Sequence, residues 1–197
     1  RYQCRKGLFL MNSYQITAWC SHFISNHVSQ GDVCIDATMG NGNDTELLCR
    51  LVGETGHVHA FDIQETALEH TKKRLESSNL LSRCTLHLIS HTQMAQYCSP
   101  ESVSCIVFNF GYLPCADHTI CTQPKSSIAA IQSGLSLLQK NGLMSLCIYS
   151  GGDTGFAERD AILSFLNTLD PKKYLVILSQ YYNRPNHPPI PAMILKL

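Results

Sequence analysis

Glycines alternate with acidic and hydroxyl side chains in one segment of the first quarter of the chain. The segment covers residues 36–45 and reads DATMGNGNDT; we call it the glycine loop. Gly40 and Gly42 allow the backbone to turn tightly and to approach a ligand where a Cβ atom would collide. Asp36 can accept a hydrogen bond, directly or through water, from the ammonium of a methionine moiety. The glycine loop is therefore a candidate cofactor site.

The glycine spacing also bears on which adenosine cofactor the loop would hold. The dinucleotide fingerprint requires a third glycine at position 45, where this chain has Thr45. A carboxylate beside the turn is also poorly suited to a pyrophosphate. The pattern thus favours S-adenosylmethionine over NAD.

Asp62 ends the next apolar run, about 20 residues after the glycines, where an acidic side chain can bind both ribose hydroxyls of an adenosine. Ile63 and Gln64 would then lie beside the adenine and the ribose. The alternative is that Asp62 only caps the helix expected from Glu65 onward. The spacing relative to Asp36 and the glycines favours the cofactor interpretation.

Residues 90–93, SHTQ, follow the third apolar run. Methyltransferases that use S-adenosylmethionine on a Rossmann-like sheet contact the adenine with the segment at this place. We expect His91 to stack on the adenine or to hydrogen-bond to it. An ordinary loop histidine is the alternative.

The fourth apolar run ends in residues 107–114, VFNFGYLP, which loosely resemble the Asn/Asp-Pro-Pro-Tyr loop of amino-group methyltransferases. In that loop an amide oxygen and a backbone carbonyl hold the protons of the target amine, so that the nitrogen lone pair faces the methyl group. An aromatic ring of the loop packs on the substrate. Asn109 is the candidate for the amide and Tyr112 for the aromatic ring. An ordinary turn at Gly111 and Pro114 is the alternative.

The elements that must position these residues alternate between strand and helix, which predicts a mainly parallel sheet with helices on both faces. An amphipathic helix at Tyr14–Val28 is expected to cover a sheet edge. The further expected strands are Val33–Ala37, His57–Ile63, Thr85–Ile89, Val103–Asn109 and Leu143–Tyr149, and the further expected helices are Asp44–Val52, Glu65–Ser78, Ser126–Gln139 and Phe156–Leu169.

The last quarter of the chain changes this pattern. The strand-like runs Tyr174–Tyr182 and Ala192–Leu197 are joined by a loop and should pair as an antiparallel hairpin. A parallel sheet that ends in a hairpin is typical of Rossmann-like methyltransferases. We therefore expect an α/β fold of this class, with seven strands in a single domain over residues 1–197 and a possible N-terminal arm at residues 1–12.

Composition narrows the compartment and the partners. No apolar run approaches the roughly 18 residues of a membrane span, and the ten cysteines include no Cys-x-x-Cys pair, so neither a membrane nor a zinc site is expected. Cys34, Cys105 and Cys147 fall within apolar strands and should act as small buried hydrophobes. The cytoplasm, or an organelle in a eukaryote, fits best. With Lys plus Arg equal to Asp plus Glu at 15 each, a nucleic-acid site would have to be a local patch.

At the level of whole motifs the chain resembles the small methyltransferases known as the YtqB or MnmM family, long labelled rRNA methylases. The matching stretches lie at 35–45, 51–58, 60–64, 108–114 and 183–189. Two segments depart from the family pattern: Asn43 replaces a usual histidine, and residues 150–153, SGGD, replace a Pro-Gly-His type segment.

The resemblance implies methylation of 5-aminomethyluridine, or its 2-thio form, at the tRNA wobble position, which gives the methylaminomethyl nucleoside. It implies catalytic roles for Asn109, Tyr112 and Asp117. The implied contacts to S-adenosylmethionine are Asp36, Thr38, Gly40, Asn41, Gly42, Asp44, Thr45, Asp62, Ile63, Gln64, His91, Thr92, Asn109 and Gly111. The implied contacts to the substrate, including the anticodon region of tRNA, are Tyr112, Pro114, Thr122, Lys125, Tyr149 and Arg184.

Three alternatives remain open on the sequence: methylation of rRNA, methylation of a small-molecule amine, and a non-catalytic cofactor-binding module. Binding of an anticodon loop calls for aromatic and cationic side chains in the loops above the site, whereas zero net charge favours a small molecule. A homodimer is possible.

Overall fold

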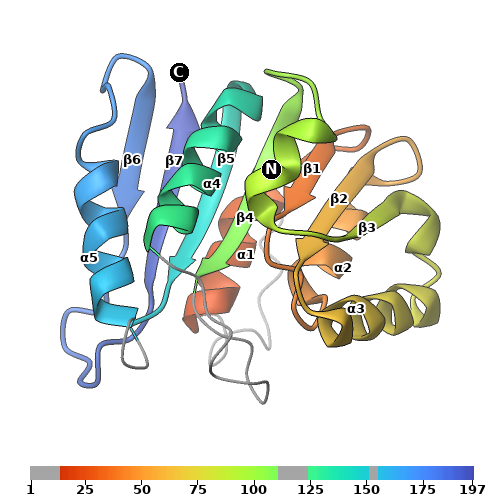
Figure 1. Cartoon of the computed structure of the whole chain (residues 1–197), viewed down its shortest axis with the longest axis horizontal. Coiled ribbons are helices and arrows are strands. Elements are labelled where there is room, and N and C mark those ends of the chain that lie inside the picture. Colours follow the sequence, from red (N-terminus) through yellow and green to blue (C-terminus); the bar gives the residue numbers. More distant parts are fainter. Residues whose placement is uncertain (1–13, 111–123, 151–154) are drawn as a thin grey trace, which may run out of the picture.

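The strands of this protein form one twisted sheet with helices on both faces (Figure 1). The computed structural model describes residues 14–110, 124–150 and 155–197. The strands are β1 Val33–Asp36, β2 His57–Asp62, β3 Cys84–Leu88, β4 Val103–Phe110, β5 Leu138–Ile148, β6 Tyr174–Leu178 and β7 Ile190–Lys196. The helices are α1 Ile16–His27, α2 Asn43–Val52, α3 Glu65–Ser77, α4 Pro124–Leu137 and α5 Gly155–Leu166, with 3₁₀ turns η1 Leu81–Arg83 and η2 His91–Gln96.

The strand order is β3-β2-β1-β4-β5-β7-β6. Strands β1 to β5 pair in parallel, whereas β7 pairs antiparallel with both β5 and β6. The predicted seven-stranded α/β fold with a closing antiparallel hairpin is confirmed. Because these strands run in the same direction, β1, β2, β4 and β5 all end at one edge of the sheet, where α/β proteins commonly bind ligands.

Several elements differ from those expected. Strand β5 begins at Leu138, within the expected helix Ser126–Gln139, rather than at Leu143. Helix α1 packs on the face of the sheet against β5 and β7, so its predicted place at a sheet edge is wrong. Strand β6 ends at Leu178, which is its last residue paired with β7, opposite Ala192, whereas the expected strand extends to Tyr182. His91 begins the 3₁₀ turn η2 rather than lying in an open loop. Residues 1–12 lie outside the described part of the chain.

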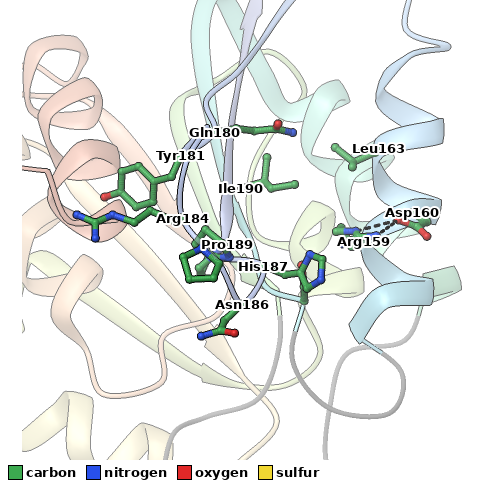
Figure 2. A pocket seen from close by; sticks show the side chains of 13 residues that line it. Arg159, Asp160, Leu163, Gln180, Tyr181, Arg184, Asn186, His187, Pro189 and Ile190 are labelled. Atoms are coloured by element: carbon green, nitrogen blue, oxygen red, sulfur yellow. Dashed lines mark hydrogen bonds and ion pairs between the residues drawn. The ribbon is translucent and has the colours of Figure 1, made fainter.

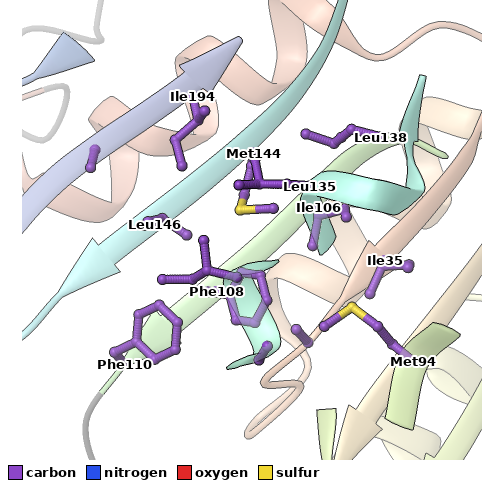
Figure 3. Packing of buried hydrophobic residues seen from close by; sticks show 14 of the residues in the cluster. Ile35, Met94, Ile106, Phe108, Phe110, Leu135, Leu138, Met144, Leu146 and Ile194 are labelled. Carbon is purple, nitrogen blue, oxygen red and sulfur yellow. The ribbon is translucent and has the colours of Figure 1, made fainter. Parts of the chain in front are cut away.

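Two apolar clusters fill the space on the two faces of the sheet. One cluster joins α1, α2 and α3 to the sheet and includes the predicted buried thiols Cys34, Cys105 and Cys147. The other joins α4, α5 and η2 to β1, β4, β5 and β7, with Phe108 and Phe110 of β4 stacked at its centre, 5.0 Å apart (Figure 3). Among the described residues, no helix is long and apolar enough to cross a membrane.

Strand β4 fixes the position of the candidate catalytic amide. Seven of its eight residues are buried, and Asn109 alone is half-buried. Phe108 and Phe110 point into the core on either side of it in sequence, so the intervening side chain must project from the opposite face of the strand. The core thereby determines where Asn109 points.

Phe108→Ala should lower the free energy of unfolding by about 3–5 kcal/mol, because the ring is fully buried and its removal leaves a cavity. Urea denaturation measures the change. Tyr182→Ala is the matched control, since that aromatic side chain is fully exposed, and it should stay within about 0.5 kcal/mol of the wild type. Equal effects of the two substitutions would contradict the assigned core.

Candidate active site

The glycine loop turns from β1 into α2 through two glycines with left-handed backbone angles. The φ angle is 48° at Gly40 and 76° at Gly42. A Cβ atom at Gly42 would lie 2.9 Å from the hydroxyl of Thr71 and 3.0 Å from its Cα atom. Both the dihedral angle and the closeness of α3 therefore require glycine at position 42.

Asp36 lies fully buried at the end of β1. One carboxylate oxygen accepts the hydroxyl of Thr45 at 2.6 Å, and the other accepts the backbone N–H of Thr38 at 3.2 Å. Burial, and then the negative charge of Asp44, raise the pKa of Asp36 to about 7 against the opposing effect of these hydrogen bonds. Asp36 thus fastens the glycine loop to β1, and its predicted contact with a cofactor ammonium stays a prediction.

Asp62 fastens the same loop from β2. Its two carboxylate oxygens accept the backbone N–H groups of Gly40 at 3.1 Å and of Gln64 at 3.0 Å. The N-cap of α3 is Gln64, without a side-chain cap. The interpretation of Asp62 as only a helix cap is therefore wrong, because half of its hydrogen bonding goes to the glycine loop.

Ile63 and His91 border this end of the sheet. Ile63 is 59% exposed directly after Asp62. The ring of His91 packs edge-on against Phe108 and Phe110, and its buried Nε2 atom has no hydrogen-bond partner within the described residues. Burial lowers the pKa of His91, so the neutral imidazole keeps one nitrogen for a ligand. Thr92 instead bonds to Ser90, which caps η2.

Asn109 connects the fourth strand to the glycine loop. Its side-chain Nδ2 donates to the Asp44 carboxylate at 2.8 Å, and its backbone N–H donates to the Thr38 hydroxyl at 2.8 Å. Because the amide nitrogen faces Asp44, the amide oxygen faces away from it and remains an acceptor. The structure thus brings Asn109 together with Thr38 and Asp44, two of the predicted residues of the cofactor loop.

Burial raises the pKa of Asp44, against the lowering effect of the Asn109 amide. Burial, and then the neighbouring Cys147 thiol, raise the pKa of Tyr149, which follows β5, and the charge of Asp44 makes a smaller contribution in the same direction. The hydroxyl of Tyr149 therefore stays protonated near neutral pH, and its role as a substrate contact stays a prediction.

The remaining predicted substrate residues fall into two groups. Lys125 is exposed in the first turn of α4, and Arg184 is exposed in the loop between β6 and β7. Gly111, Tyr112, Pro114, Asp117 and Thr122 lie outside the described residues, and their roles stay predictions.

Helix α3 contributes residues that the sequence did not reveal. The Thr71 hydroxyl donates to the backbone oxygen of Gly40 at 3.2 Å, and Arg74 Nε donates to that of Asn41 at 2.8 Å. Arg74 also binds Glu46 of α2, whose pKa falls to about 2 because Arg50, Ser78 and Arg74 donate to it. Thr71 and Arg74 lie three residues apart on one helical face, but nothing in their spacing shows that the glycine loop lies opposite.

Comparisons with known proteins agree on one family. A family model described as "Putative rRNA methylase" matches residues 58–195. A crystal structure from Clostridium thermocellum, described as a putative rRNA methylase, is 42% identical and covers 93% of this chain and 98% of its own, with a TM-score of 0.90. A methyltransferase structure from Streptococcus mutans, in complex with S-adenosylhomocysteine (SAH), is 37% identical over 92% of this chain and 97% of its own, with a TM-score of 0.83.

A relative from Arabidopsis thaliana is named tRNA (mnm(5)s(2)U34)-methyltransferase, chloroplastic. It is 33% identical over an aligned length of 171 residues, and the match covers 82% of this chain. The chain spans 62% of the length of that relative.

Asp36 makes the stability of the protein depend on pH in a defined direction. Its pKa rises from 3.8 to about 7 on folding, so the folded protein holds this proton more tightly than the unfolded chain. The contribution is therefore fully present below pH 3.8 and is lost as the pH rises to about 7. Asp36→Asn removes the titration, so the unfolding free energy of the wild type minus that of the variant should fall across this interval and then level off. Parallel pH curves from urea denaturation would contradict this assignment.

Proposed function

The chain belongs to the family described as "Putative rRNA methylase", and on that premise we propose that it is an S-adenosylmethionine-dependent N-methyltransferase acting on tRNA. The proposed reaction converts 5-aminomethyl(-2-thio)uridine to 5-methylaminomethyl(-2-thio)uridine at the wobble position. The observation that carries the proposal is the hydrogen bond from Asn109 to Asp44, which turns the amide oxygen of Asn109 away from the glycine loop's own carboxylate and leaves it to accept an amine proton.

The described residues fit S-adenosylmethionine. The left-handed glycines provide a turn without Cβ atoms, and Asp62 accepts a hydrogen bond from it. The Nε2 atom of His91 has no partner among the described residues, and the charge of Asp62 acts to raise the pKa of this histidine. When bound, the cofactor supplies an electrophilic methyl group. The glycine loop, Asp62, Ile63 and His91 would hold it.

Asn109 would orient the acceptor. A primary alkyl amine resembles lysine, with a pKa of about 10.4, and must lose a proton before it can act as a nucleophile. Desolvation of the kind that raises the pKa of Asp44 would favour the neutral form of the amine, against the attraction of the Asp44 carboxylate for an ammonium. The Asn109 oxygen then accepts one N–H and directs the nitrogen lone pair. Asp117 is the proposed proton acceptor.

Three further observations bear on the substrate and the partners. The plant relative is named as a tRNA methyltransferase, which supports the wobble uridine, whereas the family description names rRNA and makes rRNA the second candidate. Lys125 and Arg184 are exposed and cationic, as contacts to an anticodon loop require. Leu175 and Ile177, exposed along the edge strand β6, support a homodimer.

The proposed compartment is the cytoplasm, or an organelle if the source is eukaryotic. The seven cysteines described as free suit reducing surroundings, and the plant relative is named as chloroplastic.

The decisive experiment incubates the protein with methyl-labelled S-adenosylmethionine and tRNA that lacks the final methyl group, followed by nucleoside mass spectrometry. Label in 5-methylaminomethyl(-2-thio)uridine is expected. Parallel reactions with ribosomal RNA and with small amines measure the alternatives. Label confined to either of these would overturn the tRNA proposal.

Asn109→Ala should lower kcat/KM for methyl transfer about 100-fold, because the acceptor nitrogen loses its alignment. Calorimetric titration with SAH should show a much smaller change in affinity. Asn26→Ala is the matched control: this amide is exposed on α1 and bonds locally to His22. An Asn109→Ala enzyme with wild-type kcat would exclude the proposed role.

A further inference from the structure

A cavity separate from the candidate active site lies beyond the end of β5, between helix α5 and the loop that joins β6 to β7. Its volume is about 560 Å³, within the range of roughly 300–1,000 Å³ that ligand pockets occupy. We call it the α5 pocket. Its lining residues are Ser150, Arg159, Asp160, Leu163, Gln180, Tyr181, Arg184, Pro185, Asn186, His187, Pro188, Pro189 and Ile190.

Two arginines lie at opposite sides of the α5 pocket, whose other lining residues are both polar and apolar. Figure 2 shows Arg159 on the side of α5 and Arg184, with Tyr181, on the opposite side. Arg159 binds Asp160 through Nε and Nη2 and lies 4.8 Å above the Phe156 ring, so its remaining N–H groups stay available. Arg184 has no ion pair with any residue that the structure describes.

A buried hydroxyl in this pocket lacks a partner. Ser150 is 6% exposed, and its Oγ atom forms no hydrogen bond within the described chain. A buried polar group without a partner costs free energy; the Oγ atom itself is closed off in this conformation, so a ligand in the cavity would supply the missing bond once χ1 of Ser150 turns to another staggered rotamer. This observation is independent of the arginines.

The loop that forms the far wall is shaped in advance. Pro185, Pro188 and Pro189 have fixed φ angles, and Asn186 and His187 both hold left-handed φ angles, of 66° and 47°. A loop that is ordered before it binds loses less conformational entropy on binding.

The α5 pocket and the candidate active site are neighbours along one edge of the sheet. Asn109 and Phe110 end β4, and Phe110 pairs with Ile148 of β5, two residues before Ser150. The glycine loop, Asn109 and the α5 pocket thus follow the ends of β1, β4 and β5 in that order, since these three strands are adjacent. A ligand in the α5 pocket would lie next to the methyl acceptor, on the side away from the cofactor.

We propose that the α5 pocket binds a nucleotide adjacent to the methylated one in the RNA chain. This inference rests on the proposed function. The arginines would contact the phosphates that flank this nucleotide. Tyr181, the prolines and Ile190 would pack on the base or ribose, and the Ser150 hydroxyl would form a hydrogen bond with the base. Holding the neighbouring nucleotide fixes the direction from which the acceptor amine meets Asn109.

The test measures binding of an anticodon stem–loop RNA, with 5-aminomethyl-2-thiouridine at the wobble position, to the full chain saturated with SAH. Arg184→Ala should weaken binding about tenfold and reduce the slope of log K against log salt by about one. Lys172→Ala is the matched control, because this exposed cation precedes β6 at the opposite edge of the sheet, and it should change neither quantity.

Ser150→Ala separates recognition from folding. Removal of an unpartnered hydroxyl should leave the melting temperature unchanged or higher, yet weaken RNA binding about fivefold and raise KM without lowering kcat. An RNA with an abasic residue on one side of the wobble position should bind the wild type more weakly and be insensitive to Ser150→Ala. The abasic residue on the other side should not have this effect.

Two failures are distinguishable. If the wild type neither binds nor methylates the RNA, the proposed function itself is wrong. If the wild type methylates the RNA but Arg184→Ala and Ser150→Ala bind it with wild-type affinity, the α5 pocket is not a nucleotide site and the proposed function stands.

Discussion

The hydrogen bond between the Asn109 amide and the Asp44 carboxylate spans 65 positions of sequence and 2.8 Å of space. It joins the glycine loop, which follows β1, to the end of β4, which is the next strand in the sheet. An asparagine amide can turn either its oxygen or its nitrogen toward a neighbour, and a partner that only accepts hydrogen bonds selects the nitrogen. Asp44 is such a partner. The orientation of the acceptor oxygen, and with it the proposed handling of an amine, follows from this one contact.

The surrounding structure bears the electrostatic cost of that arrangement. Burial raises the pKa of both Asp36 and Asp44, and the charge of Asp44 raises that of Asp36 further. A loop that contains both carboxyl groups would be expected to open. Three hydrogen bonds hold the loop closed instead: the Thr45 hydroxyl donates to Asp36, the Gly40 N–H donates to Asp62, and Arg74 donates to the Asn41 carbonyl. Unfavourable charges that the surrounding fold holds close together are frequent at functional sites.

The sequence predicted those parts of the molecule that depend on local patterns. The glycine turn, the acidic residue after β2 and most strand limits follow from residue type and spacing, because apolar runs and glycines report on the backbone directly. It could not predict contacts made only after folding. Thr71 and Arg74 support the glycine loop because α3 packs against it. Strand β6 is shorter than expected because its pairing with β7 ends at Ala192. Ser150 becomes significant only through the cavity that it lines.

The central claim is that Asp44 acts on methyl transfer through Asn109. A double-mutant cycle tests it, with single-turnover rate constants measured at saturating cofactor and RNA for Asp44→Ala, Asn109→Ala and the double variant. If Asp44 only orients Asn109, its removal should cost nothing further once Asn109 is alanine, so the double variant should match Asn109→Ala alone. Losses that multiply across the cycle would show that the two residues act independently, and would contradict the account.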